Sequence, residues 1–133
     1  MALHFEVHAG SPSPIYEQIE IQIRRAVAAG RLHVGELLPS VRALAEQLTV
    51  NPNTVARAYA ELTAEGIIES QQGRGFFVAE RRQILTSEER SRRLDEAARR
   101  FLDETVFLDF SVSELCQRLK TLSAEYSKSP NKP

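Results

Sequence analysis

Two helix-start signals lie so close together in this sequence that a tight turn must join the helices they begin. Ser40 is a good N-cap for one helix, and Asn51 followed by Pro52 combines an N-cap with proline at the first helical position. Only Thr49 and Val50 separate the end of the first helix from the second cap. Helices joined in this way are typical of a helix-turn-helix.

Apolar residues recur at helical spacing in both segments and in a longer segment before them. Ser13 is expected to cap that earlier helix, with Pro14 at its first helical position. Gly30 and Gly66 suit C′ positions, where the chain leaves a helix with positive φ. The three predicted helices span about 14–29, 41–48 and 52–65.

Two further patterns indicate β structure. Near the N-terminus, Leu3, Phe5 and Val7 alternate with polar residues, which predicts a short half-buried strand. After the third helix, β-rich runs at 67–71 and 76–78 flank a turn that contains two glycines, which predicts a β-hairpin. Helix, helix, tight turn, helix and hairpin is the element order of a winged helix-turn-helix.

Two more helices are predicted beyond residue 80. From about 87 to 109 apolar residues fall at helical spacing, and Ser111 with Glu114 forms a capping box for a last helix. The first of the two also carries acid-to-base pairs four residues apart, which stabilise an exposed helix. These pairs are Glu88/Arg92, Glu89/Arg93, Asp95/Arg99 and Glu96/Arg100.

The last two helices offer more apolar surface than one helical hairpin can cover, and exposed patches of that size mark interfaces. We expect a homodimer; the alternative is that these side chains pack back on the winged helix in a monomer. The predicted fold is mainly α with a small β-hairpin: a winged helix-turn-helix over 1–80, a short C-terminal helical dimerisation region over 81–126 and a disordered tail over 127–133. The predicted dimerisation residues are Leu94, Phe101, Leu102, Phe107, Leu115, Leu119 and Leu122.

The third helix carries side chains suited to reading DNA. With its apolar stripe facing the core, Asn53, Thr54 and Arg57 lie on the opposite face near the N-terminus, the part of such a helix that reaches base edges. Asn pairs bidentately with adenine and Arg with guanine, and Thr offers a hydroxyl or a methyl group. The alternative is that Asn53 and Thr54 merely favour the first turn of a helix.

Two other places are candidate phosphate contacts. Ser40 and Arg42 lie at the start of a helix, where free N–H groups and the helix dipole attract anions, although Arg42 could instead pair with Glu46. The hairpin tip carries Gly73, Arg74 and Gly75, and a lone arginine on a flexible wing suits a minor groove or a phosphate, or else is simply solvated.

Six segments together resemble the DNA-binding domain of the GntR family of bacterial regulators. The two-helix C-terminal region is similar to the YtrA subfamily, and this resemblance implies a homodimeric repressor that binds a double-stranded DNA operator. It also implies that Arg42, Asn53, Thr54, Arg57 and the wing around Gly73–Gly75 face DNA. The segments are PIYEQI (14–19), GRL (30–32), GELLPSVRALA (35–45), VNPNTVARAY (50–59), EGII (65–68) and GRGFFV (73–78).

Net charge weighs weakly against DNA binding. The formal net charge is −1, because residues 1–80 carry 6 basic and 9 acidic side chains and residues 81–133 carry 11 and 9. A phosphate responds to charges within about 10 Å, so a few placed arginines can outweigh the total. A winged helix used for protein contacts or RNA is the alternative function. Arg81 and Arg82, just past the wing, are further candidates for DNA contact.

Other features point away from enzymes and secretion. His4 and His8 are too widely spaced on a strand for a compact zinc site, so no metal, cofactor or catalytic residue is expected. Cys116 is the only cysteine and is read as a small buried hydrophobe rather than a redox switch. Without a signal peptide or a long apolar run, a cytoplasmic protein with no membrane contact is expected. About 55 residues after the wing leave little room for a deep effector pocket.

Overall fold

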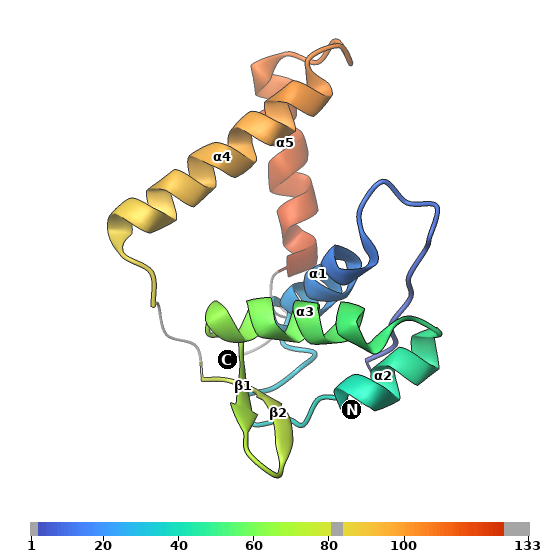
Figure 1. The fold of residues 1–133 in the computed structure, drawn as a ribbon. Helices are drawn as coiled ribbons and strands as arrows, with labels where there is room; N and C mark the ends of the chain where they lie inside the picture. The colour runs from blue at the N-terminus through green and yellow to red at the C-terminus, as the bar shows by residue number, and fades with distance from the viewer. Residues whose placement is uncertain (1–2, 81–83, 127–133) are drawn as a thin grey trace. The chain divides into compact units, whose positions relative to one another are not determined.

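The structure is a computed structural model that describes residues 3–80 and 84–126. The chain divides into two compact units, residues 1–82 with 126–133 and residues 83–125. Among the described residues, no helix has the length and apolar character needed to cross a membrane. In chain order the elements are α1 (Ile15–Ala28), α2 (Val41–Leu48), α3 (Pro52–Ala64), β1 (Ile68–Gln71), β2 (Gly75–Val78), α4 (Ser87–Thr105), α5 (Val112–Ser123) and a short 3-10 turn (Ala124–Tyr126), as Figure 1 shows.

The start of α1 differs from the prediction by one residue. Pro14, not Ser13, is the N-cap: its ψ of 153° is extended, and its carbonyl accepts the N–H groups of Glu17 and Gln18 at 3.1 Å. Ser13 instead donates its own N–H to Ser11 Oγ at 3.2 Å, within the preceding turn. The end of the helix is as predicted, because Gly30 follows the C-cap with φ of 81°.

The strand predicted at residues 3–7 does not form, because among the described residues no neighbouring strand lies beside this segment. Two side-chain amides of α1 take its backbone groups instead. Gln22 accepts from the N–H of Glu6 at 3.0 Å and donates to its carbonyl at 2.6 Å, and Gln18 does the same for His8 at 2.8 and 3.0 Å. Phe5 nevertheless turns inward and is buried, as the alternation required.

The helix-turn-helix is confirmed with both predicted caps. Ser40 Oγ accepts the N–H of Ala43 at 3.0 Å, and Asn51 Oδ1 accepts the N–H of Asn53 at 2.7 Å. Thr49 ends α2 in the left-handed conformation, at φ of 58° and ψ of 51°, which reverses the chain within two residues. The turn therefore fixes the direction of α3 relative to α2.

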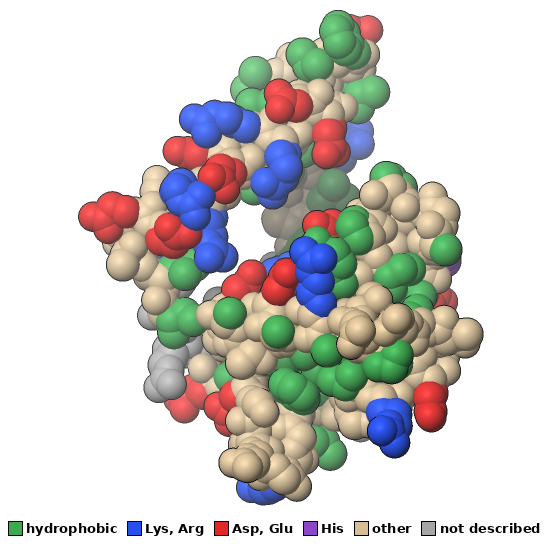
Figure 2. Space-filling view, viewed as in Figure 1, with side chains coloured by type: hydrophobic (Ala, Val, Ile, Leu, Met, Phe, Trp, Pro, Cys, Tyr) green, Lys and Arg blue, Asp and Glu red, His purple; other side chains and the backbone are tan. Residues whose placement is uncertain are grey.

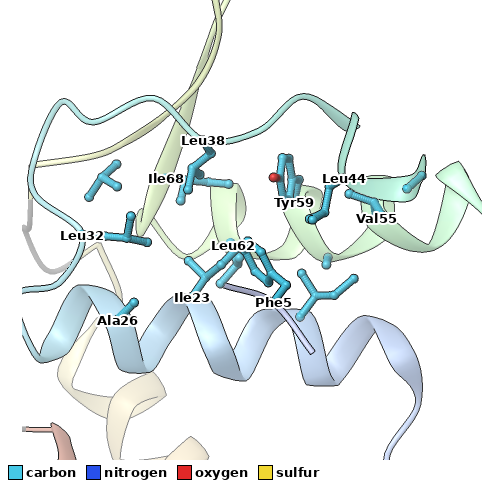
Figure 3. Packing of buried hydrophobic residues seen from close by; sticks show 14 residues of the cluster. Phe5, Ile23, Ala26, Leu32, Leu38, Leu44, Val55, Tyr59, Leu62 and Ile68 are labelled. Atoms are coloured by element: carbon cyan, nitrogen blue, oxygen red, sulfur yellow. The ribbon is translucent and has the colours of Figure 1, made fainter. Parts of the chain in front are cut away.

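The core of the first unit forms where α1, α2 and α3 meet the loop 31–39 and the hairpin (Figure 3). Tyr59 at its centre is fully buried, and its hydroxyl donates to the Pro39 carbonyl at 2.7 Å. Its ring meets Phe76 of β2 edge-on, with centroids 4.9 Å apart. Burial raises the pKa of the Tyr59 hydroxyl, so the side chain stays a neutral donor.

The predicted hairpin is confirmed, with Ile68 opposite Val78 and Gln71 opposite Gly75. The loop before α2 lies along the free edge of β2. Leu38 donates its N–H to the Phe76 carbonyl at 2.8 Å, and the N–H of Val78 donates to the Glu36 carbonyl at 2.9 Å. Backbone bonds thus join the wing to the segment that leads into α2.

The second unit has no buried side chain among its described residues. The capping box of Ser111 and Glu114 is confirmed. The helix predicted to reach about 109 ends at Thr105, and Asp109 takes a left-handed φ of 63° in the connection. Cys116 is exposed in the single chain, so its predicted burial is not observed.

The acid-to-base pairs along α4 follow the prediction in part. The Glu89/Arg93 pair forms at 3.1 Å, whereas Arg92 contacts Glu89 and Glu96 in place of Glu88. Figure 2 shows the result as basic and acidic side chains interleaved along this helix. Arg81 and Arg82, and the predicted tail over 127–133, lie outside the described residues.

One carboxyl group is buried between α1 and α3. Glu20 is only 4% exposed, with Arg24 Nη1 3.8 Å from its Oε1 and with Glu61 and Glu65 facing it from the other helix. Burial first, and then a hydrogen bond to the Glu61 carboxylate, raises the pKa of Glu20 to about 8, against the opposing charge of Arg24. Glu20 is therefore mostly protonated at neutral pH.

This burial predicts how stability depends on pH. The pKa of Glu20 lies higher in the folded chain than in the unfolded chain, so its stabilising effect is complete below about pH 4.5 and is lost as pH rises through 8. Glu20→Gln, which cannot ionise, should remove this loss, which amounts to about 4 kcal/mol between pH 5 and pH 9. Urea unfolding at several pH values measures it.

Glu46→Gln is the matched control, because Glu46 is exposed on α2 and its replacement should leave the wild-type profile unchanged. Equal pH dependence in the wild type and Glu20→Gln would contradict the assignment.

Candidate nucleic-acid interface

The first turn of α2 presents an exposed arginine beside free backbone N–H groups. Ser40 is the N-cap, and Arg42 lies exposed two residues later, within the first turn of the helix. The alternative pairing with Glu46 does not form: within residues 3–80 and 84–126, no ion pair engages Arg42. The guanidinium of Arg42 is therefore available to an anion.

The N-terminal half of α3 is exposed on the face opposite the core. Asn53 and Arg57 are exposed, whereas Thr54 is half-buried at the side of the helix. The buried stripe of α3 packs into the core, which fixes the orientation of the exposed face. The residues of that stripe are Val55, Ala58, Tyr59 and Leu62.

Arg57 does not extend freely into solvent. Its guanidinium carbon lies 3.8 Å from the centre of the Tyr16 ring on α1, and its Nε donates to Glu61 Oε2 at 3.2 Å. Neither Tyr16 nor Glu61 was among the predicted site residues. The i,i+4 spacing of Arg57 and Glu61 was a usable signal, but the contact with Tyr16 depends on how α1 packs on α3.

The tip of the wing is exposed at Gly73 and Arg74, and Gly75 is half-buried. Gly73 has φ of 76° and Gly75 has φ of 116°, conformations that side chains with a Cβ rarely adopt. Arg74 folds back: its Nη1 donates to Gln71 Oε1 at 3.0 Å, and its guanidinium lies 5.4 Å from the Phe77 ring. Both contacts lie within the hairpin itself, the hydrogen bond is exposed and the ring contact is long, so Arg74 can turn outward.

An open hollow lies beside the turn that joins α2 to α3. It is shallow and widely open to solvent, so it is not an enclosed ligand cavity. Its lining residues are Arg42, Ala45, Glu46, Thr49, Val50, Asn51 and Pro52.

The predicted dimerisation residues lie on α4, on α5 and in the connection between them, and none is buried in the single chain. Phe107 is 91% exposed and Leu94 is 69% exposed. Phe101 and Leu115 are half-buried, which makes them the most covered of the set. The remaining three, Leu102, Leu119 and Leu122, are about half exposed.

Comparison with known proteins shows the family. The profile of the bacterial regulatory proteins of the gntR family matches residues 15–78. The chain is 34% identical over 120 residues to the HTH-type transcriptional repressor YtrA of Bacillus subtilis. The aligned region covers 90% of this chain and 92% of that protein.

Two solved structures extend the comparison. The crystal structure of a transcriptional antiterminator from Listeria monocytogenes has a TM-score of 0.83 and 29% identity, covering 98% of this chain and 97% of that chain. The DNA-binding domain of AraR in complex with an operator has a TM-score of 0.52 and 30% identity, covering 57% of this chain and 98% of that chain. The chain thus belongs to the gntR family of bacterial regulatory proteins.

Proposed function

We propose that the protein is a homodimeric transcriptional repressor that binds a pseudo-palindromic DNA operator, with α3 in the major groove and the β1–β2 wing against the minor groove or the backbone. As a member of the gntR family it is a DNA-binding transcriptional regulator. The likeness to the AraR domain, solved on an operator, supports this mode of binding, and the likeness to the YtrA repressor supports repression.

The observation that carries the proposal is the exposed N-terminal face of α3. Asn53 and Arg57 project from a helix that is anchored by its buried stripe and begins at a tight turn. In helix-turn-helix proteins these first turns enter the major groove, where Asn and Arg make the two bidentate contacts that distinguish bases. Thr54, half-buried at the side of the helix, fits a phosphate contact better than a base contact.

Phosphate contacts would set the register of α3 on the duplex. Ser40 and Arg42 at the start of α2 combine free N–H groups, the positive end of a helix dipole and a full positive charge. Arg74, flanked by Gly73 and Gly75, would supply a second anchor from the wing. These local charges matter more to a phosphate than the net charge of −1.

A second copy of the chain is the proposed partner of the C-terminal helices. The helices α4 and α5 bury none of their side chains in the single chain, so their apolar residues remain in water unless another surface covers them. A two-fold pair would cover both copies at once and would place two recognition helices on one DNA molecule. Linking two weak sites in this way raises affinity through effective concentration.

One comparison favours an RNA ligand as the second candidate. The Listeria monocytogenes protein with the TM-score of 0.83 is described as a transcriptional antiterminator, a term that fits action on a transcript as well as on DNA. Binding assays therefore need an RNA of the same sequence beside the DNA duplex.

Variants of the recognition helix test the proposal. Asn53→Ala and Arg57→Ala should each remove about 1–3 kcal/mol of discrimination between the operator and an unrelated duplex, because each removes one bidentate base contact. Fluorescence anisotropy with both duplexes measures this loss. Arg31→Ala, which removes the same charge from an exposed position beyond α1, should leave discrimination unchanged. Wild-type discrimination in both recognition variants, or tighter binding to the matching RNA, would contradict the proposal.

Arg42→Ala should behave differently from the recognition variants. Loss of a phosphate contact weakens binding to every sequence and flattens the dependence of log K on log salt by about one unit. Titrations at several salt concentrations measure this slope, and an unchanged slope would remove Arg42 from the DNA-contact surface.

The dimer has a separate test in sedimentation. The full chain should sediment as a dimer at micromolar concentration, and Leu102→Glu with Leu119→Glu should produce a folded monomer, because both side chains are about half exposed in the single chain. The monomer should retain the cooperative unfolding of the first unit and bind the operator much more weakly. A wild-type chain that sediments as a monomer would contradict the dimer.

A further inference from the structure

Arg57 is held at two points by groups from two different helices. The Tyr16 ring from α1 covers one face of the guanidinium at 3.8 Å, and Glu61, one turn further along α3, accepts from Nε at 3.2 Å. A long arginine side chain has many rotamers, and most of that freedom is removed before any ligand arrives. The orientation of Arg57 is therefore set by the protein.

The two groups that hold Arg57 have contacts of their own. Tyr16 lies in the first turn of α1 and packs against the core cluster. Glu61 lies beside the buried Glu20, and its pKa is lowered first by the hydrogen bond from Glu20 and then by Arg57. An anion thus faces Arg57 over the ordinary pH range, and the Tyr16 ring is half-buried against the core.

This arrangement leaves one edge of the guanidinium open. The stacked face and Nε are occupied, whereas neither Nη atom of Arg57 donates to a protein group in the part of the chain that the structure describes. The Nη1–Nη2 edge is a fork of parallel donors that matches the O6 and N7 acceptors of guanine. The contacts of Arg57 are therefore compatible with bidentate reading and do not compete with it.

We propose that Tyr16, with Glu61, is a specificity-positioning residue that orients Arg57 so that its Nη edge meets a guanine in the operator. This rests on the proposed function, in which Arg57 reads a base. The first helix, which a helix-turn-helix uses to support the other two, then takes part in sequence discrimination without touching DNA. Tyr16 acts only through Arg57, and that dependence makes the proposal testable.

The experiment measures the ratio of affinities for two duplexes, using the full-length protein. One duplex is the tightest binder from in vitro selection, and the other has the same length and a scrambled sequence. The proteins are the wild type, Tyr16→Phe, Tyr16→Leu, Glu61→Ala and Arg57→Ala, and each of Tyr16→Leu and Glu61→Ala is also combined with Arg57→Ala. Thermal unfolding checks that each variant is folded at the assay temperature.

Tyr16→Phe should keep the wild-type ratio, because the ring stays and no hydrogen bond of the Tyr16 hydroxyl supports Arg57. Tyr16→Leu should lower the ratio by about 5- to 10-fold, the range of a partly buried cation–π contact. Glu61→Ala should lower it by about threefold and should fold readily, since alanine favours a helix. Neither change should lower the ratio further once Arg57→Ala is present.

Two outcomes separate the failure of this inference from failure of the proposed function. If Arg57→Ala keeps the wild-type ratio, Arg57 reads no base, and both the recognition assignment and the role of Tyr16 are overturned. If Arg57→Ala lowers the ratio but Tyr16→Leu and Glu61→Ala do not, only the positioning role is overturned. The same holds if these two changes lower the ratio by the same factor in the Arg57→Ala background as in the wild type.

Discussion

The buried hydroxyl of Tyr59 connects the three parts of the first unit that are proposed to meet DNA. It extends from α3 and donates at 2.7 Å to Pro39, the residue just before the N-cap of α2. Its ring meets Phe76 on the wing, whose carbonyl in turn accepts from Leu38. A buried hydrogen bond of this kind contributes about 1 kcal/mol, and leaving the carbonyl unpaired would cost more. The helix α3, the start of α2 and the wing are therefore held in one rigid arrangement.

The second unit, with α4 and α5, differs from the first in how its helices are stabilised. Its helices are stabilised locally, by the cap at Ser111 and by ion pairs along α4, and not by burial of side chains. Exposed ion pairs contribute less than about 1 kcal/mol each, and the described residues of this unit include no buried side chain that would add to them. Stability that is missing inside the unit can come from a second copy, which would make folding and pairing of the C-terminal helices a single process.

The sequence predicts well those structural features that depend on residues close together in the chain, such as helix caps. Caps at Ser40, Asn51 and Ser111 act within one turn of helix, and each is present as predicted. The strand at 3–7 was predicted wrongly because alternation reports burial on one side but does not report whether a partner strand exists. Here the amides of Gln18 and Gln22 replace that partner.

In the candidate site too, features that depend on nearby residues were predictable and features that depend on tertiary packing were not. Exposure of Asn53 and Arg57 followed from the apolar period of α3. Contact of Arg57 with Tyr16 did not, because it joins residues 41 positions apart in the sequence through packing of α1 on α3. Burial of Glu20 was missed for a similar reason: a glutamate in an amphipathic helix is ordinarily read as part of the solvent face.

A hydroxyl-radical footprint of the full chain on the promoter DNA of its own gene tests the central claim most directly. Paired winged helices predict two protected windows on one face of the duplex, with centres about 10 base pairs apart or a multiple of that spacing. Both windows should appear at the same protein concentration, because the dimer binds as a unit. A single window, or protection that is equal on a scrambled duplex, would contradict the account.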